Sequence, residues 1–139
     1  MKDRNNIGNI LNSLGIAHAK RRSYRKAMRC FEDSLLLRKA LLGNNHPEVG
    51  ETLHNIGNCA AKQGDFEKAS ESFREALSIK ENVQGHNSLT YLKTLHNMGI
   101  VHEEKEENGL ALECYEKCFE GRRNLLGSDH LDVAFSLHR

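Results

Sequence analysis

Apolar and polar positions alternate in this chain with the period of an α-helix. In the middle of the sequence, apolar or small residues recur at steps of three and four, which places them on one face of a helix. One such segment carries Leu53, Ile56, Gly57 and Ala60, and the next carries Phe66, Ala69, Ser70, Phe73, Ala76 and Leu77. The pattern predicts two amphipathic helices whose apolar stripes pack against each other.

The same pattern recurs at a fixed distance of 42 residues. The letters TLHN occur at Thr52–Asn55 and again at Thr94–Asn97, and SLHR stands at Ser136–Arg139. Each unit has two large apolar residues followed by glycine, alanine and an aromatic residue: Leu11, Leu14, Gly15, Ala27 and Phe31; Leu53, Ile56, Gly57, Ala69 and Phe73; Leu95, Met98, Gly99, Ala111 and Tyr115. A fixed period of this length is typical of stacked helical repeats. We predict one segment over residues 1–139, with repeats at about 5–42, 47–84 and 89–126 and a partial repeat at 130–139.

Small residues and capping residues mark how the predicted helices cross and where they end. Gly57 and Ala69 leave room for a close approach of the two helices beside the larger Phe73. Gly64 followed by Asp65 predicts a left-handed helix end and then an N-cap. Ahead of the first helices we expect caps from Asn45 with Glu48 and from Asp129 with Asp132, and Pro47 in a first turn.

The third unit departs from the pattern of the first two. Its turn, Glu104–Asn108, has neither the glycine nor the aromatic residue of the second unit, so we expect a looser turn. Gly109 and Gly121 fall inside its second helix, which predicts lower local stability. Beyond it, we expect partly uncovered apolar surface that could promote self-association, from Leu131, Val133, Phe135 and Leu137.

The spacing of large apolar, glycine, alanine and aromatic positions resembles the tetratricopeptide repeat (TPR). The long second helix and the strings ALSIKENVQG from Ala76 and LGNNHPEV from Leu42 resemble the 42-residue kinesin light chain type of this repeat. The resemblance implies an all-α, right-handed α-solenoid of stacked helix-turn-helix hairpins, three repeats plus part of a fourth. It also implies first helices on the inner face, and a protein-protein interaction scaffold that binds an extended peptide or partner segment in its concave groove.

Residues of the first helices that point away from the apolar stripe are our candidates for this groove. An asparagine amide offers both donors and an acceptor, so it can bond a peptide backbone while the peptide side chains stay free. Lysines at one end and Glu103 and Glu104 at the other give a charge gradient that could set peptide direction. Asn55 and Asn97 could instead only fasten neighbouring helices. The candidates are Asn9, Asn12, Ile16, Lys20, Glu51, His54, Asn55, Asn58, Lys62, Lys93, His96, Asn97, Ile100, Glu103, Glu104 and His138.

Histidines and cysteines provide no convergent metal site in this pattern. His54, His96 and His138 recur at the 42-residue period, and their unperturbed pKa near 6.5 makes a pH-sensitive groove possible. Because successive first helices lie about 10 Å apart, we favour solvated or peptide-facing histidines over metal ligands. His18 and His102 are expected to pack between helices. The four cysteines, Cys30, Cys59, Cys114 and Cys118, are expected to be buried, inert free thiols.

Composition narrows the possible functions further. No apolar run approaches the length of a membrane helix and no leader pattern opens the chain, so we expect a cytoplasmic protein. The net charge is only +1, but the first third is basic. A cluster there leaves electrostatic binding of nucleic acid or anionic membrane as an alternative, although a solvated turn explains it more simply: Lys20, Arg21, Arg22, Tyr24, Arg25, Lys26 and Arg29. No motif for catalysis or for a cofactor is present, and we predict no enzyme activity.

Overall fold

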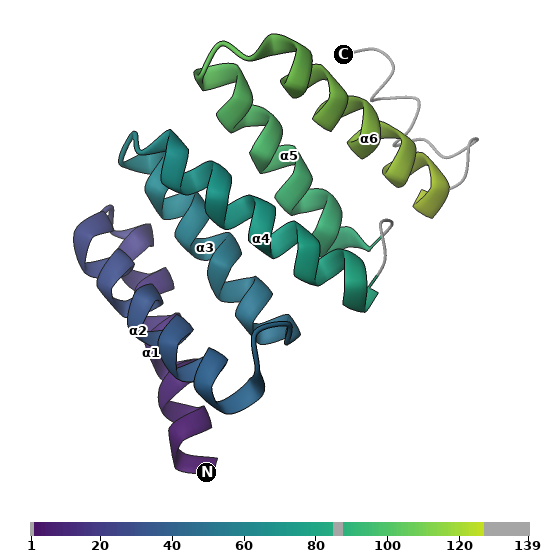
Figure 1. Ribbon diagram of the computed structural model, residues 1–139. Coiled ribbons are helices and arrows are strands. Elements are labelled where there is room, and N and C mark those ends of the chain that lie inside the picture. Colours follow the sequence, from purple (N-terminus) through teal and green to yellow (C-terminus); the bar gives the residue numbers. More distant parts are fainter. Residues whose placement is uncertain (1, 85–87, 127–139) are drawn as a thin grey trace.

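The described structure consists of α-helices. The computed structural model describes residues 2–84 and 88–126, where all regular structure is helical. The elements are α1 (Lys2–Lys20), α2 (Tyr24–Leu42), α3 (Pro47–Lys62), α4 (Phe66–Gln84), α5 (Leu89–Glu104) and α6 (Asn108–Leu126). They form three hairpins that stack side by side (Figure 1). The predicted all-α hairpin solenoid is confirmed, while the partial repeat at 130–139 lies outside the described residues.

The first helix of each hairpin lies on the inner face of the stack. Every helix packs on the next one along the chain. In addition, Cα atoms of α1 and α3, and of α3 and α5, approach within 8 Å, whereas those of α2 and α4, or of α4 and α6, do not. The first helices are therefore closer together than the second helices, and the stack is concave on the side of α1, α3 and α5. Its right-handed twist stays a prediction.

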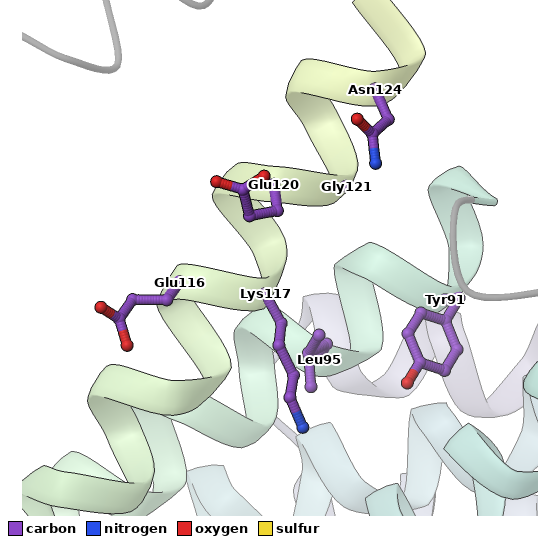
Figure 2. Close-up of a pocket in the computed structure, with 7 residues that line it drawn as sticks. All are labelled: Tyr91, Leu95, Glu116, Lys117, Glu120, Gly121 and Asn124. Atoms are coloured by element: carbon purple, nitrogen blue, oxygen red, sulfur yellow. The ribbon is translucent and has the colours of Figure 1, made fainter.

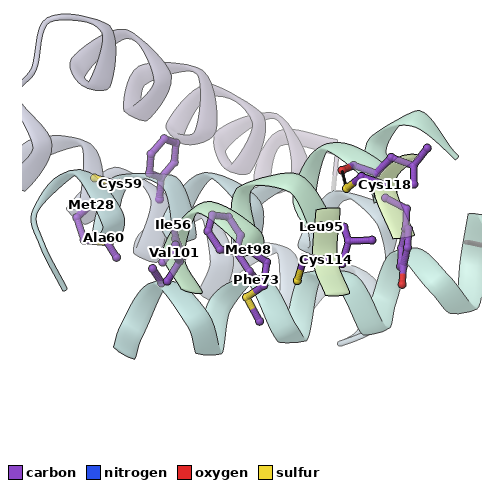
Figure 3. Packing of buried hydrophobic residues seen from close by; sticks show 14 of the residues in the cluster. Met28, Ile56, Cys59, Ala60, Phe73, Leu95, Met98, Val101, Cys114 and Cys118 are labelled. Atoms are coloured by element: carbon purple, nitrogen blue, oxygen red, sulfur yellow. Dashed lines mark hydrogen bonds between the residues drawn. The ribbon is translucent and has the colours of Figure 1, made fainter. Parts of the chain in front are cut away.

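Each hairpin crosses at a glycine, as the period predicted. A Cβ atom on Gly57 would lie 2.5 Å from Cε1 of Phe73, and one on Gly15 would meet Phe31 at the same distance. Both phenylalanines are buried, and the burial of each contributes about 2 kcal/mol. Figure 3 shows Phe73 among Ile56, Met98 and Val101, in the core that joins the second and third hairpins. A side chain larger than hydrogen at Gly57 would push α3 away from α4.

The turn of the third hairpin is built like the other two, which corrects the looser turn we expected. The second residue after the first helix has a positive φ in all three hairpins: Arg22 at 64°, Gly64 at 81° and Glu106 at 62°. The backbone N–H after it donates over 2.8–2.9 Å to the carbonyl five residues earlier in each case. The left-handed conformation costs a non-glycine residue about 1 kcal/mol. In the third turn, an ion pair of Lys105 with Glu67 (2.8 Å) ties the turn to α4.

One predicted helix cap is confirmed and one is wrong. Asp65 caps α4, because its Oδ1 accepts a hydrogen bond from the backbone N–H of Lys68 at 3.2 Å. The cap of α3 is His46 rather than Asn45: the imidazole Nδ1 accepts from the N–H of Glu48 at 3.1 Å. Pro47 occupies the first helical position, as expected. The caps predicted from Asp129 and Asp132 lie outside the described residues.

Exposed apolar residues gather on α1, which the sequence did not predict. Leu14 is 46% exposed, although its counterpart one repeat later, Ile56, is 2% exposed. Ile7 and Ile10 on the same helix are also exposed. Ile56 is covered because α3 has a hairpin on either side, whereas no described hairpin packs on the outer side of α1. The apolar residues that we predicted to be uncovered near the C-terminus, 131–137, lie outside the described residues.

Candidate functional site

Two hollows on the inner face repeat with the sequence. The first inner hollow, of about 230 Å³, lies between α1 and α3 and is lined by Ile16, Ala19, Lys20, Tyr24, Phe31, Asn55, Asn58, Cys59 and Lys62. The second, of about 400 Å³, lies between α3 and α5 and is lined by Asn58, Ala61, Lys62, Phe66, Phe73, Asn97, Ile100, Val101 and Glu104. Each residue of the second list stands 42 positions after one of the first. The repeat therefore builds the same concave feature twice.

Asparagine side chains tie neighbouring first helices together at the edge of these hollows. The Nδ2 group of Asn55 donates to Oδ1 of Asn12 at 3.1 Å, and Nδ2 of Asn97 donates to Oδ1 of Asn58 at 2.9 Å. The helix-fastening role that we weighed for Asn55 and Asn97 is therefore present. Within the described part of the chain, the Oδ1 atoms of both residues accept no hydrogen bond, so each keeps an acceptor available.

Family models match most of this array. A model described as tetratricopeptide repeat matches residues 6–82, and a second one with the same description matches residues 92–132. The chain belongs to the tetratricopeptide repeat family. Members of this family are non-enzymatic scaffolds for protein interactions, and this TPR array is a protein-interaction scaffold. Among the described residues, no helix combines the length and apolar character needed to cross a bilayer.

Solved structures share the fold of this TPR array, including one described as kinesin light chain TPR-like repeats. BtubC (BKLC) from P. vanneervenii matches with a TM-score of 0.83 at 19% identity, over 91% of this chain and 50% of that chain. A P. anserina protein described as a kinesin light chain with nearly identical TPR-like repeats matches with 0.82 at 16% identity, over 99% and 65%. The Sgt2 TPR domain from Aspergillus fumigatus matches with 0.65 at 25% identity, over 84% and 67%. The TPR array thus spans half of the first relative and about two thirds of the second, and no curated protein matches it.

Three predicted groove residues take part in the contact between the first two repeats, and the burial of one of them, Asn12, corrects its assignment. Asn12 is only 4% exposed, and its Nδ2 donates to Oε1 of Glu51 at 2.9 Å. Asn9 uses its Oδ1 to accept from the Arg38 guanidinium at 2.8 Å. Because the Asn12 amide is buried and already paired, Asn12 supports the groove rather than forming its binding surface. Asn9 and Glu51 line neither inner hollow, and their place in the binding surface stays a prediction.

A buried cation joins α2 and α4 each to the next repeat, and sequence reasoning missed it. Arg38 is 4% exposed and donates to Oγ1 of Thr52 at 2.8 Å and to the carbonyl of Glu48 at 2.9 Å. Lys80 is 8% exposed and donates to Oγ1 of Thr94 at 2.8 Å. Burial lowers the pKa of Lys80 to about 8. The signal that could have revealed this pair is a cation followed 14 residues later by threonine in successive repeats.

His54 is a structural residue, which corrects the pH-sensitive histidine that we considered. Its Nε2 accepts from Nδ2 of Asn58 at 3.1 Å, so the proton is on Nδ1, which donates to Oγ1 of Thr94 at 2.7 Å. The ring packs on Phe73 with a centroid distance of 5.7 Å. Burial, helped by the charge of Lys80, lowers the pKa of His54 to about 4. The imidazole is therefore neutral at physiological pH and titrates well below neutrality.

The remaining predicted groove residues line neither of the two inner hollows. His96 is exposed, with its ring centroid 5.5 Å from that of Tyr115, and Lys93 is exposed on the same helix. Glu103 accepts a hydrogen bond from the Tyr115 hydroxyl, and burial together with this carboxylate raises the tyrosine pKa. His138 lies outside the described residues.

Buried histidine and cysteine side chains stabilise the TPR array. His102 is buried as expected, and its Nδ1 lies 2.8 Å from Oε1 of Glu107 across the third turn. Cys59, Cys114 and Cys118 are buried and Cys30 is half-buried, all as free thiols. Burial raises the pKa of Cys118 to about 11. A thiol that holds its proton so strongly is a poor nucleophile at neutral pH.

A third hollow, of about 470 Å³, lies between α5 and α6. Figure 2 shows Tyr91 and Leu95 on α5 facing one side of this outer hollow, with Lys117 reaching toward Leu95 and Glu116 pointing away. Its other lining residues are Glu120, Gly121 and Asn124. It shares no residue with the two inner hollows, and it contains none of the residues that the sequence suggested for binding. Our candidate site is therefore the pair of inner hollows.

Proposed function

We propose that the TPR array binds an extended segment of a partner protein along its inner face, with partner side chains seated in the two inner hollows. The observation that carries this proposal is the relation between the hollows: both are lined by the same positions of successive repeats. A receptor that presents equivalent sites at regular intervals suits a ligand that is itself regular, such as an extended backbone.

The distance between repeats suits this kind of ligand. Packed helices lie about 8–10 Å apart, and an extended chain advances about 3.3 Å per residue. Side chains about three residues apart along the partner would therefore reach neighbouring hollows. In each hollow a buried phenylalanine, Phe31 or Phe73, forms the floor, and an exposed isoleucine, Ile16 or Ile100, offers apolar contact.

The asparagine ladder supports backbone recognition. Asn55 and Asn97 each donate to the preceding first helix, which fixes the orientation of the amide before a partner arrives. The acceptor oxygen of each amide can then take a hydrogen bond from a partner N–H. Because these side chains are held in place, little conformational entropy is lost on binding.

Eight of the predicted groove residues line the hollows and carry the proposal. They are Ile16, Lys20, Asn55, Asn58, Lys62, Asn97, Ile100 and Glu104. Tyr24 also lines the first inner hollow instead of interleaving with the arginines around it, which favours a peptide over the nucleic acid or membrane that the basic cluster suggested.

The test uses a random 12-residue peptide library displayed on phage, selected on the intact chain. The affinity of each selected peptide is measured for the wild type and for Ile16→Ala with Ile100→Ala. We expect about a tenfold loss, because two partly exposed apolar contacts are removed without touching the asparagine ties. Leu36→Ala with Leu112→Ala is the matched control, since both leucines are exposed on second helices. Equal affinities for all three proteins would overturn the proposal.

A further inference from the structure

The last residue of each first helix changes from a cation to an anion along the TPR array, so the two inner hollows differ in charge. Lys20, Lys62 and Glu104 occupy the same place at the ends of α1, α3 and α5, 42 residues apart. Lys20 and Lys62 both line the first inner hollow, so two ammonium groups face it. Lys62 and Glu104 both line the second, so one cation and one anion face that hollow. The two hollows are lined by equivalent positions of the repeat but differ in the charge of their lining side chains.

We call Lys20, Lys62 and Glu104 the charge column. Its three side chains are available to a partner. All three side chains are exposed, and within residues 2–84 and 88–126 none of them forms an ion pair or a side-chain hydrogen bond. The surroundings reinforce the difference. Arg21 and Arg22 follow Lys20 directly and are exposed, whereas Glu103 precedes Glu104.

We propose that this charge column sets the register of the partner: the first inner hollow takes a carboxylate side chain, and the second takes an uncharged apolar side chain about three residues away. This inference rests on the proposed function and names the chemistry of its ligand. A carboxylate in the first inner hollow meets two ammonium groups, whereas in the second it would meet a repelling carboxylate. Phe66, which is half-buried, and Ile100, which is exposed, line the second inner hollow and favour an apolar group there.

The difference in ligand preference between the two hollows arises from Lys20 and Glu104, the residues at the two ends of the charge column. Lys62 is common to both hollows and cannot distinguish them. Lys20 makes the first hollow cationic, and Glu104 neutralises the second. Exchanging the two charges, Lys20→Glu with Glu104→Lys, should therefore move the cationic hollow one repeat along the array without changing its net charge.

The experiment repeats the phage selection on the wild type, on the charge-exchanged variant and on Lys26→Glu. Lys26 is exposed on α2 and lines neither hollow, so it controls for a charge change alone. We expect wild type and Lys26→Glu to enrich peptides with an acidic residue about three positions from an apolar one. The charge-exchanged variant should enrich the same two residues in the opposite order. In the best wild-type peptide, replacing the acidic residue by its amide should weaken binding about tenfold at low salt and less at high salt.

Each outcome distinguishes the inference from the proposed function. Enrichment of one common motif by wild type and the charge-exchanged variant, or peptides without any acidic preference, would overturn the charge register while leaving groove binding intact. Loss of all binding by a charge-exchanged variant that melts like the wild type would also overturn it. Selected peptides whose affinity does not respond to Ile16→Ala with Ile100→Ala would refute groove binding itself.

Discussion

The second and third hairpins make the same helix contact with their large and small residues exchanged. In the second hairpin, Gly50 on α3 faces Ile79 on α4, and a Cβ atom on the glycine would lie 3.2 Å from the isoleucine. In the third, Leu92 on α5 has the place of Gly50, and Gly121 on α6 has the place of Ile79. A Cβ atom on Gly121 would lie 2.4 Å from Leu92.

This exchange explains Gly121, which we had expected to lower the local stability of its helix. Packing density requires that the two facing side chains together fill the space between the helices, and it does not require a particular residue on either helix. Gly121 is a poor helix former, but it is needed where Leu92 projects toward α6. From one hairpin to the next, the combined volume of the two facing side chains is thus kept, although the large residue moves to the other helix.

The largest expected effect comes from breaking this complementarity. Leu92→Gly should lower the free energy of unfolding by about 4 kcal/mol, since it creates a cavity and a flexible helix position. Gly121→Ile should lower it by about 3 kcal/mol through overpacking. The double variant copies the second hairpin and should lose at least about 2 kcal/mol less than the sum of the single losses, as measured by urea unfolding.

The exposed Leu112 provides the control for these substitutions. Leu112→Gly on α6 should cost about 1 kcal/mol, the cost of a glycine in a helix without a cavity. Strict additivity of the stability losses from Leu92→Gly and Gly121→Ile would show that the two positions do not compensate for each other. The exchange of large and small residues between the hairpins would then not contribute to stability.

The buried cations extend the comparison to the contacts between hairpins. Among the described residues, Arg38 donates hydrogen bonds to Asn9, Glu48 and Thr52, whereas Lys80 donates to Thr90 and Thr94 alone. We expect Arg38→Ala to cost about 3 kcal/mol and Lys80→Ala about 2 kcal/mol, because more polar groups lose their partners in the first case.

Calorimetric melting of the two variants measures this difference. Arg29→Ala, on the exposed side of α2, is the matched control and should change stability by less than about 0.5 kcal/mol. A loss at Arg38→Ala no greater than at Arg29→Ala would show that the buried guanidinium does not hold the repeats together.

The same two cations should respond differently to pH. The pKa of Lys80 is lowered by burial to about 8, whereas an unfolded lysine keeps its proton to about pH 10.5. Between these values the unfolded chain binds more protons, so the contribution of Lys80 to the free energy of unfolding rises with pH. Arginine stays charged throughout this range. The difference in stability between wild type and Lys80→Met should therefore shift in favour of the wild type from pH 7.5 to pH 10.

Lys80→Arg supplies the control for that measurement, because it keeps a cation that does not titrate. Its stability difference from Lys80→Met should stay constant over the same pH range. A wild-type curve parallel to that of Lys80→Arg would mean that Lys80 keeps an ordinary pKa in the folded TPR array.

The contribution of His54 to stability also depends on pH, at the acidic end of the range. Its pKa is lowered to about 4 in the folded chain, so between pH 6.5 and 4 the unfolded chain binds more protons and stability falls as the solution is acidified. NMR titration of the ring protons should give a midpoint near pH 4. A midpoint near pH 6.5 would mean that the contacts with Phe73 and Thr94 do not bury the ring.

The sequence was sufficient to predict how the helices of the second hairpin cross and turn. The glycine and aromatic pair at Gly57 and Phe73, and the turn at Gly64 and Asp65, follow from local spacing. Contacts between hairpins were harder to predict. Charged residues such as Arg38 are usually solvated, and only the stacked structure shows that this one lies between α2 and α3.

The candidate site was predicted in part for the same reason. Ile16, Asn58 and Lys62 were identified because the first helices line the inner face. Asn12 was misassigned, since its burial depends on how Glu51 and Thr52 of the next repeat approach it. Helix position alone indicates which face a side chain is on, but not whether a neighbouring repeat already pairs its polar atoms.

The most direct test of binding on the inner face is an NMR titration of the isotope-labelled chain with a library-selected peptide. Amide shifts should change first and most at residues that line both inner hollows, Asn58 and Lys62, and then at Ile16 and Ile100. Changes centred on Tyr91 and Gly121, at the outer hollow between α5 and α6, would contradict the account.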